Sequence, residues 1–273
     1  MEHYGDDPCE EFMPKINGGS TDIDDKTKRL TALMHKAITI IQFKVEASMI
    51  KRHPEWDMQD RLLLECIDYD NATCNISGKS YEMKSCCFPT VNPNAPYELT
   101  PDEIILMSKL HHSFTVNEKL HKHIRLLLSH GSLYTIINDN LLFHASVPLN
   151  DDGSLKEVEL CKGHKYKGRE LMNRTEHIIR NAFQNDSDPR EKEFSVDYFL
   201  YLWCGRNSVL FDKSKMATFE RYFLKDKSTY KEEKGNYFKL RNNEEECDAI
   251  LDAFGVSGQN RHIINGHVPV HVV

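Results

Sequence analysis

The sequence predicts an α/β protein with a mostly helical first half and a mixed α/β second half. Apolar residues recur at three- and four-residue spacing through residues 24–52, which is typical of one face of a long helix. After residue 130 the pattern changes to short apolar runs separated by turn-forming residues, which is typical of strands. The two halves of the chain therefore follow different periods.

The composition is that of a globular protein with a sizeable core. The 273 residues are 40% hydrophobic, and 35 basic against 42 acidic residues give a formal net charge of -7. This balance argues against a general nucleic-acid surface, which needs clustered Lys and Arg. No apolar run is long enough to span a membrane, and the acidic start "MEHYGDDPCEEF" does not resemble a signal peptide. We therefore expect a cytoplasmic protein without a membrane span. The eight cysteines include no CxxC pair, so free thiols are expected.

Three regions are predicted along the chain. Residues 1–23 are polar and show no period, so they are predicted to be a tail or linker. Residues 24–130 are predicted to be mostly helical, and residues 131–273 to be a mixed α/β region. The first helix should run from Asp24 to Arg52 and stop at Pro54. Its expected apolar face consists of Leu30, Met34, Ala37, Ile38, Ile41, Val45 and Met49.

Local signals place further elements in the first half. A second helical piece covers "DMQDRLLLECI", and a hairpin is expected around Ser77 and Gly78 because of the turn chemistry there. Thr100, Pro101 and Glu103 form a helix-start signature, with a capping threonine, a proline at the first position and an acid at the third. That helical region should continue toward His130.

The second half should begin with an antiparallel hairpin, "SLYTIINDNLLFHASVPLNDDGS", whose second strand ends at His144. Helices are predicted over residues 168–184, 192–204, 216–225 and 243–254. The last of them starts after Asn243 with three glutamates and ends at Gly255, as the preferences of helix ends require.

His144 and His267 occupy similar positions in the sequence. Each follows an apolar run and precedes an irregular segment, which is where α/β folds often place functional side chains. Neutral imidazoles there can bind Mn, Fe or Zn. Most such histidines, however, only hydrogen-bond a backbone group, and the pattern alone leaves both interpretations open.

A denser group of histidines precedes residue 131. On a helix, ligands at i and i+4 share a face, whereas His121 and His123 at i and i+2 diverge, so this spacing argues against a metal site. We expect solvated helix residues at His111, His112, His121, His123 and His130.

A basic and aromatic stretch follows residue 205. Because the protein is acidic overall, this stretch could neutralise the phosphate of a phosphorylated sugar. Lys213, Arg221 and Lys225 are the candidate substrate-binding residues, since they cluster beside aromatic side chains. The alternative is a solvated helix face.

Strings along nearly the whole chain resemble a known family. "GSLYTIINDNLLFHASVPLNDDGS", "YKGRELMNR", "YLWCGRNSVLFDK", "MATFERYFLKDKSTYKEEKGNYFKLR" and "HIINGHVPV" are similar to the bacterial class III fructose-1,6-bisphosphatases, a branch of the calcineurin-like metallophosphoesterases. The similar strings occur in the same order in this chain as in the family.

The resemblance implies a fold and an activity. It implies an incomplete calcineurin-like α/β sandwich, with residues 24–130 as a helical insertion or cap and residues 131–273 as the second half of the core. It also implies a dinuclear site, usually with manganese, that hydrolyses the 1-phosphate of fructose 1,6-bisphosphate in gluconeogenesis. His144 matches the ligand histidine after the later core strand, and His267 matches the histidine of the final Gly-His motif.

The chain departs from the family pattern in two places. The first three ligand motifs of the superfamily, Asp-x-His, GDxxDR and GNH, do not occur in this sequence. The family usually reads His-Gly-Cys where this chain reads His144, Ala145 and Ser146. We therefore expect an internal fragment that is catalytically inactive alone, with no ligands besides the two histidines and with the missing N-terminal half as a possible partner.

Two alternatives accompany this interpretation. One is a related metallophosphoesterase with another phosphoester substrate, which a comparison of substrates would distinguish. The other is a non-catalytic helical interaction module from a split gene, which should fold stably without metal and bind a partner protein.

Overall fold

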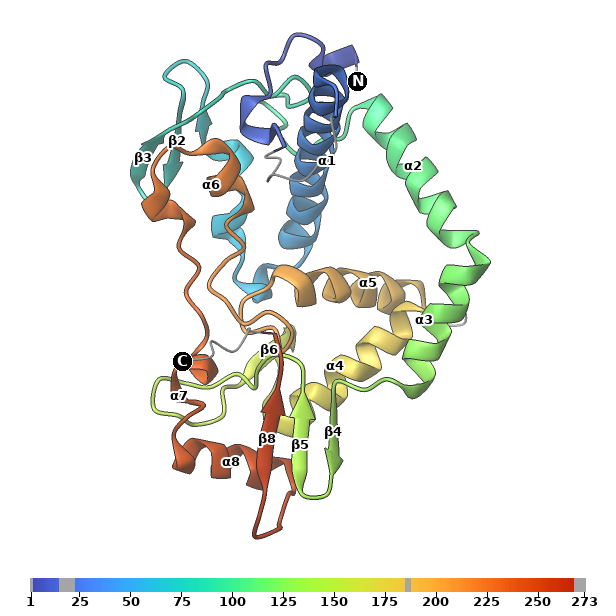
Figure 1. Ribbon diagram of the computed structural model, residues 1–273, viewed down its shortest axis with the longest axis vertical. Coiled ribbons are helices and arrows are strands. Elements are labelled where there is room, and N and C mark those ends of the chain that lie inside the picture. Colours follow the sequence, from blue (N-terminus) through green and yellow to red (C-terminus); the bar gives the residue numbers. More distant parts are fainter. Residues whose placement is uncertain (1, 15–22, 185–187, 268–273) are drawn as a thin grey trace. The chain divides into compact units, whose positions relative to one another are not determined.

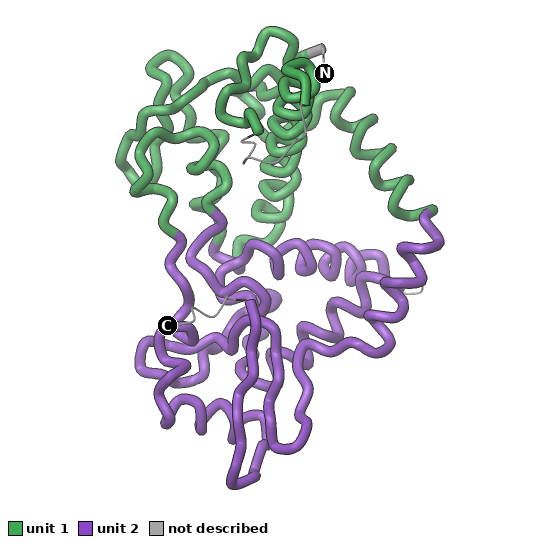
Figure 2. The backbone as a smooth tube through the Cα atoms, viewed as in Figure 1, with its two compact units in different colours: residues 1–54, 58–116, 217–231 green, residues 55–57, 117–216, 232–273 purple. Residues whose placement is uncertain are grey.

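The computed structural model describes residues 2–14, 23–184 and 188–267 (Figure 1). The chain folds into two compact units (Figure 2). Unit 1 comprises residues 1–54, 58–116 and 217–231, and unit 2 comprises residues 55–57, 117–216 and 232–273. Both units contain helices and small sheets, so the α/β class is confirmed.

The long helix α1 (Asp25–Arg52) organises unit 1. It starts where the sequence indicates, because the Asp24 carboxylate caps the helix by accepting a hydrogen bond from the Thr27 backbone NH. It ends just before Pro54, since proline disfavours helical backbone at the residue that precedes it. Both predicted limits of this helix are confirmed.

The buried face of α1 differs from the expected one. Leu30, Met34 and Ile38 are 46%, 57% and 43% exposed, so this part of the prediction is wrong. Lys36 and Lys44 are fully buried instead. The apolar spacing did not predict the buried face, because that face includes two lysines that buried acids from other segments neutralise.

The first of these acids lie in the N-terminal segment, which contains two 3-10 turns, η1 (Glu2–Tyr4) and η2 (Glu10–Phe12). Lys36 Nζ lies 2.6 Å from an Asp7 carboxylate oxygen and 2.7 Å from a Glu11 carboxylate oxygen. Tyr4 and Phe12 belong to the core of unit 1. The prediction of a tail is therefore wrong for residues 2–12, while residues 15–22 lie outside the described part of the chain.

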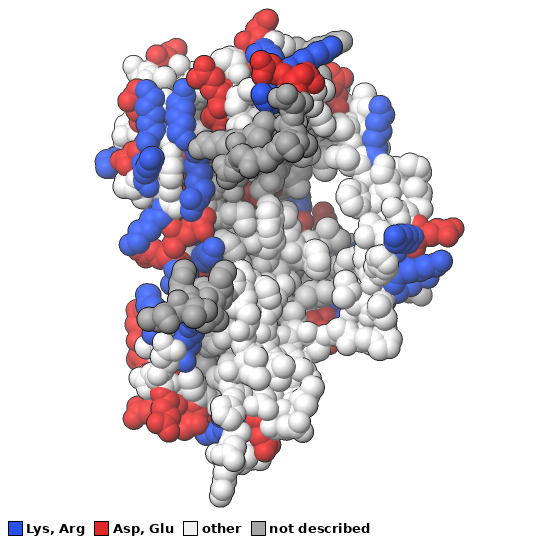
Figure 3. All heavy atoms as spheres, viewed as in Figure 1, with Lys and Arg blue, Asp and Glu red and all other residues white. Residues whose placement is uncertain are grey.

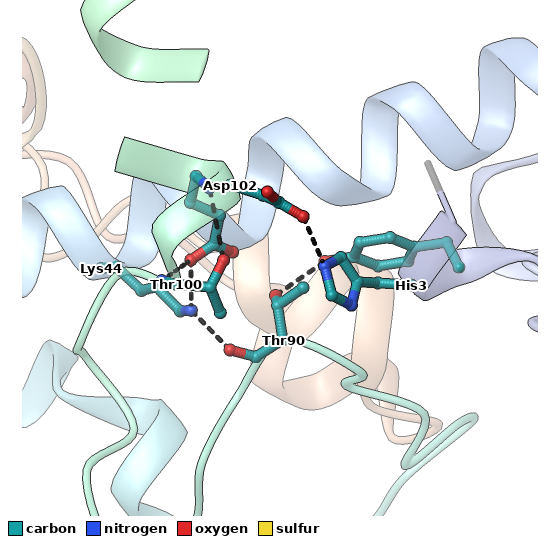
Figure 4. Close-up of polar contacts among 7 residues, drawn as sticks. His3, Lys44, Thr90, Thr100 and Asp102 are labelled. Carbon is teal, nitrogen blue, oxygen red and sulfur yellow. Dashed lines mark hydrogen bonds and ion pairs between the residues drawn. The ribbon is translucent and has the colours of Figure 1, made fainter. Parts of the chain in front are cut away.

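The second buried lysine joins α1 to α2 (Pro101–Thr115). Lys44 Nζ donates to the Thr90 carbonyl oxygen and to a Glu103 carboxylate oxygen, both at 2.7 Å (Figure 4). Glu103 also closes the predicted capping box with Thr100. The same glutamate thus starts one helix and neutralises a buried cation from another.

A small antiparallel sheet completes the middle of unit 1. Its strands are β1 (Ile67–Asp68), β2 (Thr73–Ile76) and β3 (Lys79–Glu82), in that order. The hairpin between β2 and β3 turns at Ser77 and Gly78, which both have positive φ, and it is confirmed. The helical piece expected before the sheet is present only as the 3-10 turns η4 (Gln59–Arg61) and η5 (Leu63–Cys66).

Unit 1 also contains a segment from late in the sequence, with α6 (Thr218–Phe223) and η6 (Lys227–Tyr230). Arg61 forms a two-pronged ion pair with the fully buried Glu220, at 2.8 and 2.9 Å. Phe219 and Phe223 pack into the core of the same unit. The predicted boundary at residue 130 therefore differs from the observed division, because residues 217–231 join unit 1 and residues 117–130 join unit 2.

Unit 2 contains most of the remaining helices. The helical region expected up to His130 is interrupted at Val116 and Asn117, and Asn117 caps the separate helix α3 (Glu118–His130). The other predicted helices of this unit are present as α4 (Gly168–Ala182), α5 (Pro189–Cys204) and α8 (Glu244–Phe254). Asn243 caps α8, and Gly255 ends it in the left-handed region, as expected. Two further short elements are not indicated by the sequence patterns: η3 (Pro54–Trp56) and α7 (Asn236–Leu240).

The strands of unit 2 form two small sheets. The first has the order β4 (Tyr134–Ile137), β5 (Asn140–Phe143) and β8 (His262–Asn265), and the second pairs β6 (Val158–Cys161) with β7 (His164–Tyr166). The antiparallel hairpin of β4 and β5 is confirmed. These sheets have three and two strands, so the calcineurin-like sandwich stays a prediction.

Two further predictions from the sequence concern the cysteines and the helices. All eight cysteines are free thiols, as expected. Within residues 2–14, 23–184 and 188–267, no helix is long and apolar enough to cross a membrane.

Candidate metal centre

Two strands that are far apart in the sequence bring His144 and His267 together. Strands β5 and β8 pair in parallel, with Phe143 opposite Asn265 (Figure 1). His144 directly follows β5, and His267 follows β8 after Gly266. Because the carboxyl ends of parallel strands meet at one edge of a sheet, both imidazoles lie at the same edge.

The two rings are in direct contact. His267 Nδ1 lies 3.1 Å from His144 Nε2, and the ring planes are nearly perpendicular, at 82°. His267 has a φ of 67°, in the left-handed region that few residues with side chains adopt. This turn directs the ring back toward His144 instead of along the strand direction.

Hydrogen bonds hold the two loops at this edge. The Gly266 backbone NH donates to the His144 carbonyl oxygen at 2.9 Å, and Asn265 Nδ2 donates to the Ala145 carbonyl oxygen at 3.2 Å. The hydroxyl of the buried Tyr237 donates to Asn265 Oδ1 at 3.1 Å. The backbone positions of both histidines are thereby fixed by groups that are not themselves candidate ligands.

The electrostatic surroundings favour a neutral ring at His267. Partial burial lowers the pKa of His267 below the ordinary histidine value, and His144, Lys213 and Lys234 lower it further. A neutral imidazole keeps a lone pair for a metal ion, whereas an imidazolium does not. His267 therefore stays available as a ligand at lower pH than an ordinary histidine.

The spacing of the two nitrogens suits a shared metal ion. Nitrogens bound to one divalent ion at about 2.1 Å lie roughly 3.0–3.4 Å apart when the bond angle is between about 90° and 110°. The observed 3.1 Å falls in this range. The pair therefore fits one ion as a partial ligand set. In the described part of the chain, no group of three or more His, Cys, Asp and Glu side chains could hold a metal ion.

The three candidate substrate-binding residues are divided between the units. Lys213 belongs to unit 2, where it influences His267 and pairs with Glu232 at 3.1 Å. Arg221 and Lys225 belong to unit 1. Arg221 donates to the Tyr230 carbonyl oxygen, and Lys225 forms an ion pair with Glu82. The basic side chains of unit 1 gather over β3 and α6, at the upper left of Figure 3. Only Lys213 is thus placed with the histidine pair in one unit.

The groups that support the site have little local signal in the sequence. Asn265 and Tyr237 position the loop of His267, yet neither stands out in the sequence. The Asn265-Gly266 pair is a turn signal that could have indicated the reversal after β8. The partnership with Tyr237 depends on long-range packing, which local patterns do not report.

The fold and the histidine pair define an α/β protein with two adjacent imidazoles at one edge of a sheet. A family model described as Firmicute fructose-1,6-bisphosphatase matches residues 1–273. The chain belongs to this fructose-1,6-bisphosphatase family.

Curated relatives named "Fructose-1,6-bisphosphatase class 3" are similar to this chain along its whole length. The protein of Phocaeicola vulgatus is 53% identical over 274 residues, which cover 100% of this chain and 41% of the relative. The protein of Clostridium botulinum is 49% identical over 273 residues, which cover 99% of this chain and 40% of the relative. The chain thus spans about two fifths of the length of these relatives. No solved structure matches it.

Proposed function

We propose that this chain forms part of the catalytic centre of a fructose-1,6-bisphosphatase, which hydrolyses the 1-phosphate of fructose 1,6-bisphosphate in gluconeogenesis. In this proposal His144 and His267 are ligands of a dinuclear manganese site. The observation that carries the proposal is the 3.1 Å contact of the two ring nitrogens at the ends of parallel strands, in a chain that belongs to this family.

The chemistry of the site is divided between the metal ions and the chain. Two bound manganese ions would polarise the phosphoryl group and lower the pKa of a bound water molecule. His144 and His267 hold lone pairs at a fixed separation, and Asn265 and Tyr237 keep their loops in place. Lys213 adds positive charge on the same side, which favours an anionic substrate.

The remaining ligands must come from other parts of the enzyme. Manganese prefers carboxylate and other oxygen ligands alongside imidazole, and two imidazoles cannot bridge two ions. The aspartate-containing and asparagine-containing motifs that the family resemblance leads us to expect are not in this sequence. The part of the relatives outside the matched region is the natural source of these groups, and therefore the partner of this chain in catalysis.

The first prediction is that the purified chain with manganese releases no phosphate from fructose 1,6-bisphosphate above the rate in buffer. The reason is the incomplete ligand set. The measurement is a colorimetric phosphate assay, with the full-length Phocaeicola vulgatus relative as the positive control.

Two outcomes would contradict the proposal. Manganese-dependent turnover by the chain alone would show that its two histidines are not a partial set. If the full-length relative hydrolysed other phosphoesters in preference to fructose 1,6-bisphosphate, the proposed substrate would be wrong.

The second prediction concerns Lys213, in a full-length enzyme in which this chain replaces the matched region of the Phocaeicola vulgatus relative. We expect Lys213→Met to raise the KM roughly tenfold or more, because a hydrogen bond to a charged group contributes about 1.5–3 kcal/mol. Steady-state kinetics at saturating manganese measure this effect.

Lys239→Met is the matched control for Lys213. Lys239 lies in the same unit, donates to the Asn236 side chain and does not contribute to the pKa shift of His267. Equal KM values for both variants would show that Lys213 does not bind the substrate. The roles of Arg221 and Lys225 in binding phosphate stay predictions, and the same assay tests them.

A further inference from the structure

Helix α3 has an apolar face that the described part of unit 2 covers only in part. Leu120, Ile124, Leu127 and Leu128 follow at positions i, i+4, i+7 and i+8, which share one face of a helix. All thirteen residues of α3 are described, and none of them is buried. On this face Leu127 is 69% exposed, while Leu120, Ile124 and Leu128 are half-buried. A helix of this length is marginal in water without packing on an apolar partner.

The exposed face borders a groove between three helices. The groove has a volume of about 280 Å³ and is lined by apolar side chains from α3, α4 and α5. We call it the α3–α5 groove, and its apolar lining includes Ile124, Leu127, Leu133, Ile179, Phe183 and Phe199.

Polar contacts fix the walls of this groove. Ser132 Oγ and the Leu133 backbone NH donate to Glu176 on α4, at 2.7 and 3.1 Å. Arg180 on α4 donates to the Gly131 carbonyl oxygen at 3.0 Å. The end of α3 is therefore attached to α4, and the groove is a formed feature of unit 2.

The apolar surface continues from the groove along α5. Val196, Phe199 and Trp203 lie at i, i+3 and i+7 and are 52%, 47% and 48% exposed. Phe199 also packs edge-on against Phe183 of α4, with ring centroids 5.8 Å apart. Contiguous exposed apolar surface of this kind marks an interaction site.

The charges beside the groove indicate what kind of partner fits. Lys122 and Arg125 line the adjoining hollow on α3, together with Arg180. Basic side chains are visible over α3 at the right edge of Figure 3, together with acidic ones. A second copy bound through the same face would bring like charges together, which is unfavourable. An apolar segment with acidic flanks would satisfy both the groove and its rim.

We propose that the α3–α5 groove is the docking site for an apolar, acid-flanked segment of the fructose-1,6-bisphosphatase polypeptide outside the matched region. The relatives have polypeptide outside the matched region, since the chain covers only 41% of the Phocaeicola vulgatus protein. Docking there buries the apolar face of α3 and the stripe on α5. The proposal rests on family membership and does not depend on metal binding by the histidines.

Hydrogen exchange tests this proposal. Amide exchange is measured by mass spectrometry for this chain and for the full-length Phocaeicola vulgatus relative, both in EDTA, so that failure of the manganese proposal does not affect the result. We expect the peptide corresponding to α3 to exchange at least about tenfold more slowly in the full-length protein, because burial suppresses local opening. The peptide of α4 around the buried Leu171 and Met172 is the internal control, with similar exchange in both proteins.

Surface variants separate docking from general stability. In the full-length enzyme that carries this chain, Leu127→Asp and Arg125→Glu should return α3 to fast exchange. Lys119→Glu, which changes an exposed residue outside both hollows, should not. A misfolded variant would lose protection in the α4 control peptide as well, and is recognised in that way.

Two results would overturn the proposal. One is equal exchange of α3 in the chain and in the full-length relative. The other is a dimer of this chain alone in analytical ultracentrifugation that dissociates on Leu127→Asp, because that result assigns the face to a second copy.

Discussion

Replacing His267 with alanine lowers kcat for fructose 1,6-bisphosphate by at least about 100-fold in the full-length enzyme that carries this chain. Removing a group that only hydrogen-bonds to a metal ligand typically lowers activity or metal affinity about 10–100-fold. Removing a ligand itself should lower them further. His144→Ala is expected to have an effect of similar size, since the two rings share one position at the sheet edge. Steady-state kinetics and metal content by mass spectrometry measure both consequences.

His262→Ala is the matched control for this experiment. His262 is an exposed histidine on β8, the strand that leads to His267, and its ring contacts the Asn140 side chain. Its removal should change kcat by less than about twofold, as for a surface substitution. If His267→Ala retained the activity and the manganese content of His262→Ala, the proposed ligand role would be wrong.

Replacing Lys36 with methionine lowers the free energy of unfolding of this chain by about 3–5 kcal/mol, because two buried carboxylates lose their cation. Lys36 is completely buried between Asp7 and Glu11. Burial lowers the pKa of Lys36, but its hydrogen bonds to Asp7 and Glu11 outweigh this effect, so the pKa is raised above the ordinary lysine value. Thermal melting should show a decrease in Tm of roughly 10 °C.

Two controls isolate the effect of the buried charge. Lys28→Met removes the half-buried partner of the exposed Asp25 on the same helix and should cost no more than about 1 kcal/mol. The triple variant Lys36→Met, Asp7→Asn and Glu11→Gln removes both carboxylates with the cation, and should recover most of the lost stability. Equal melting temperatures for Lys36→Met and Lys28→Met would show that the buried ion pairs do not stabilise unit 1.

Local chemistry made much of the secondary structure predictable. The limits of α1, the capping box at Thr100, the turn at Ser77 and Gly78, and the end of α8 at Gly255 each depend on residues within a few positions of one another. Caps and tight turns satisfy backbone groups locally, so their residue types are informative without knowledge of the fold.

Long-range pairing was not predictable from these patterns. Lys36 is buried because acids of the N-terminal segment, whose sequence predicts a tail, neutralise it, while Leu30 and Met34 are exposed. The association of residues 217–231 with unit 1 follows from the pairing of Arg61 with Glu220 across 159 positions. In each case the deciding partner is remote in the sequence.

The candidate site was predictable only in part. The family resemblance identified His144 and His267, and the structure brings these two residues together. The sequence did not reveal the parallel pairing of β5 with β8 that achieves this, nor the separation of Lys213 from Arg221 and Lys225 into different units. Which strands pair in this way depends on long-range packing, which the sequences of the strands alone do not indicate.

The parallel pairing of β5 with β8 also has a kinetic consequence. Closing a loop of more than 100 residues is entropically costly, and structures that depend on such distant contacts assemble slowly. The two imidazoles are 123 positions apart, so their contact closes a long loop. During biosynthesis the two imidazoles would therefore come into contact only once β8 had been added to the sheet.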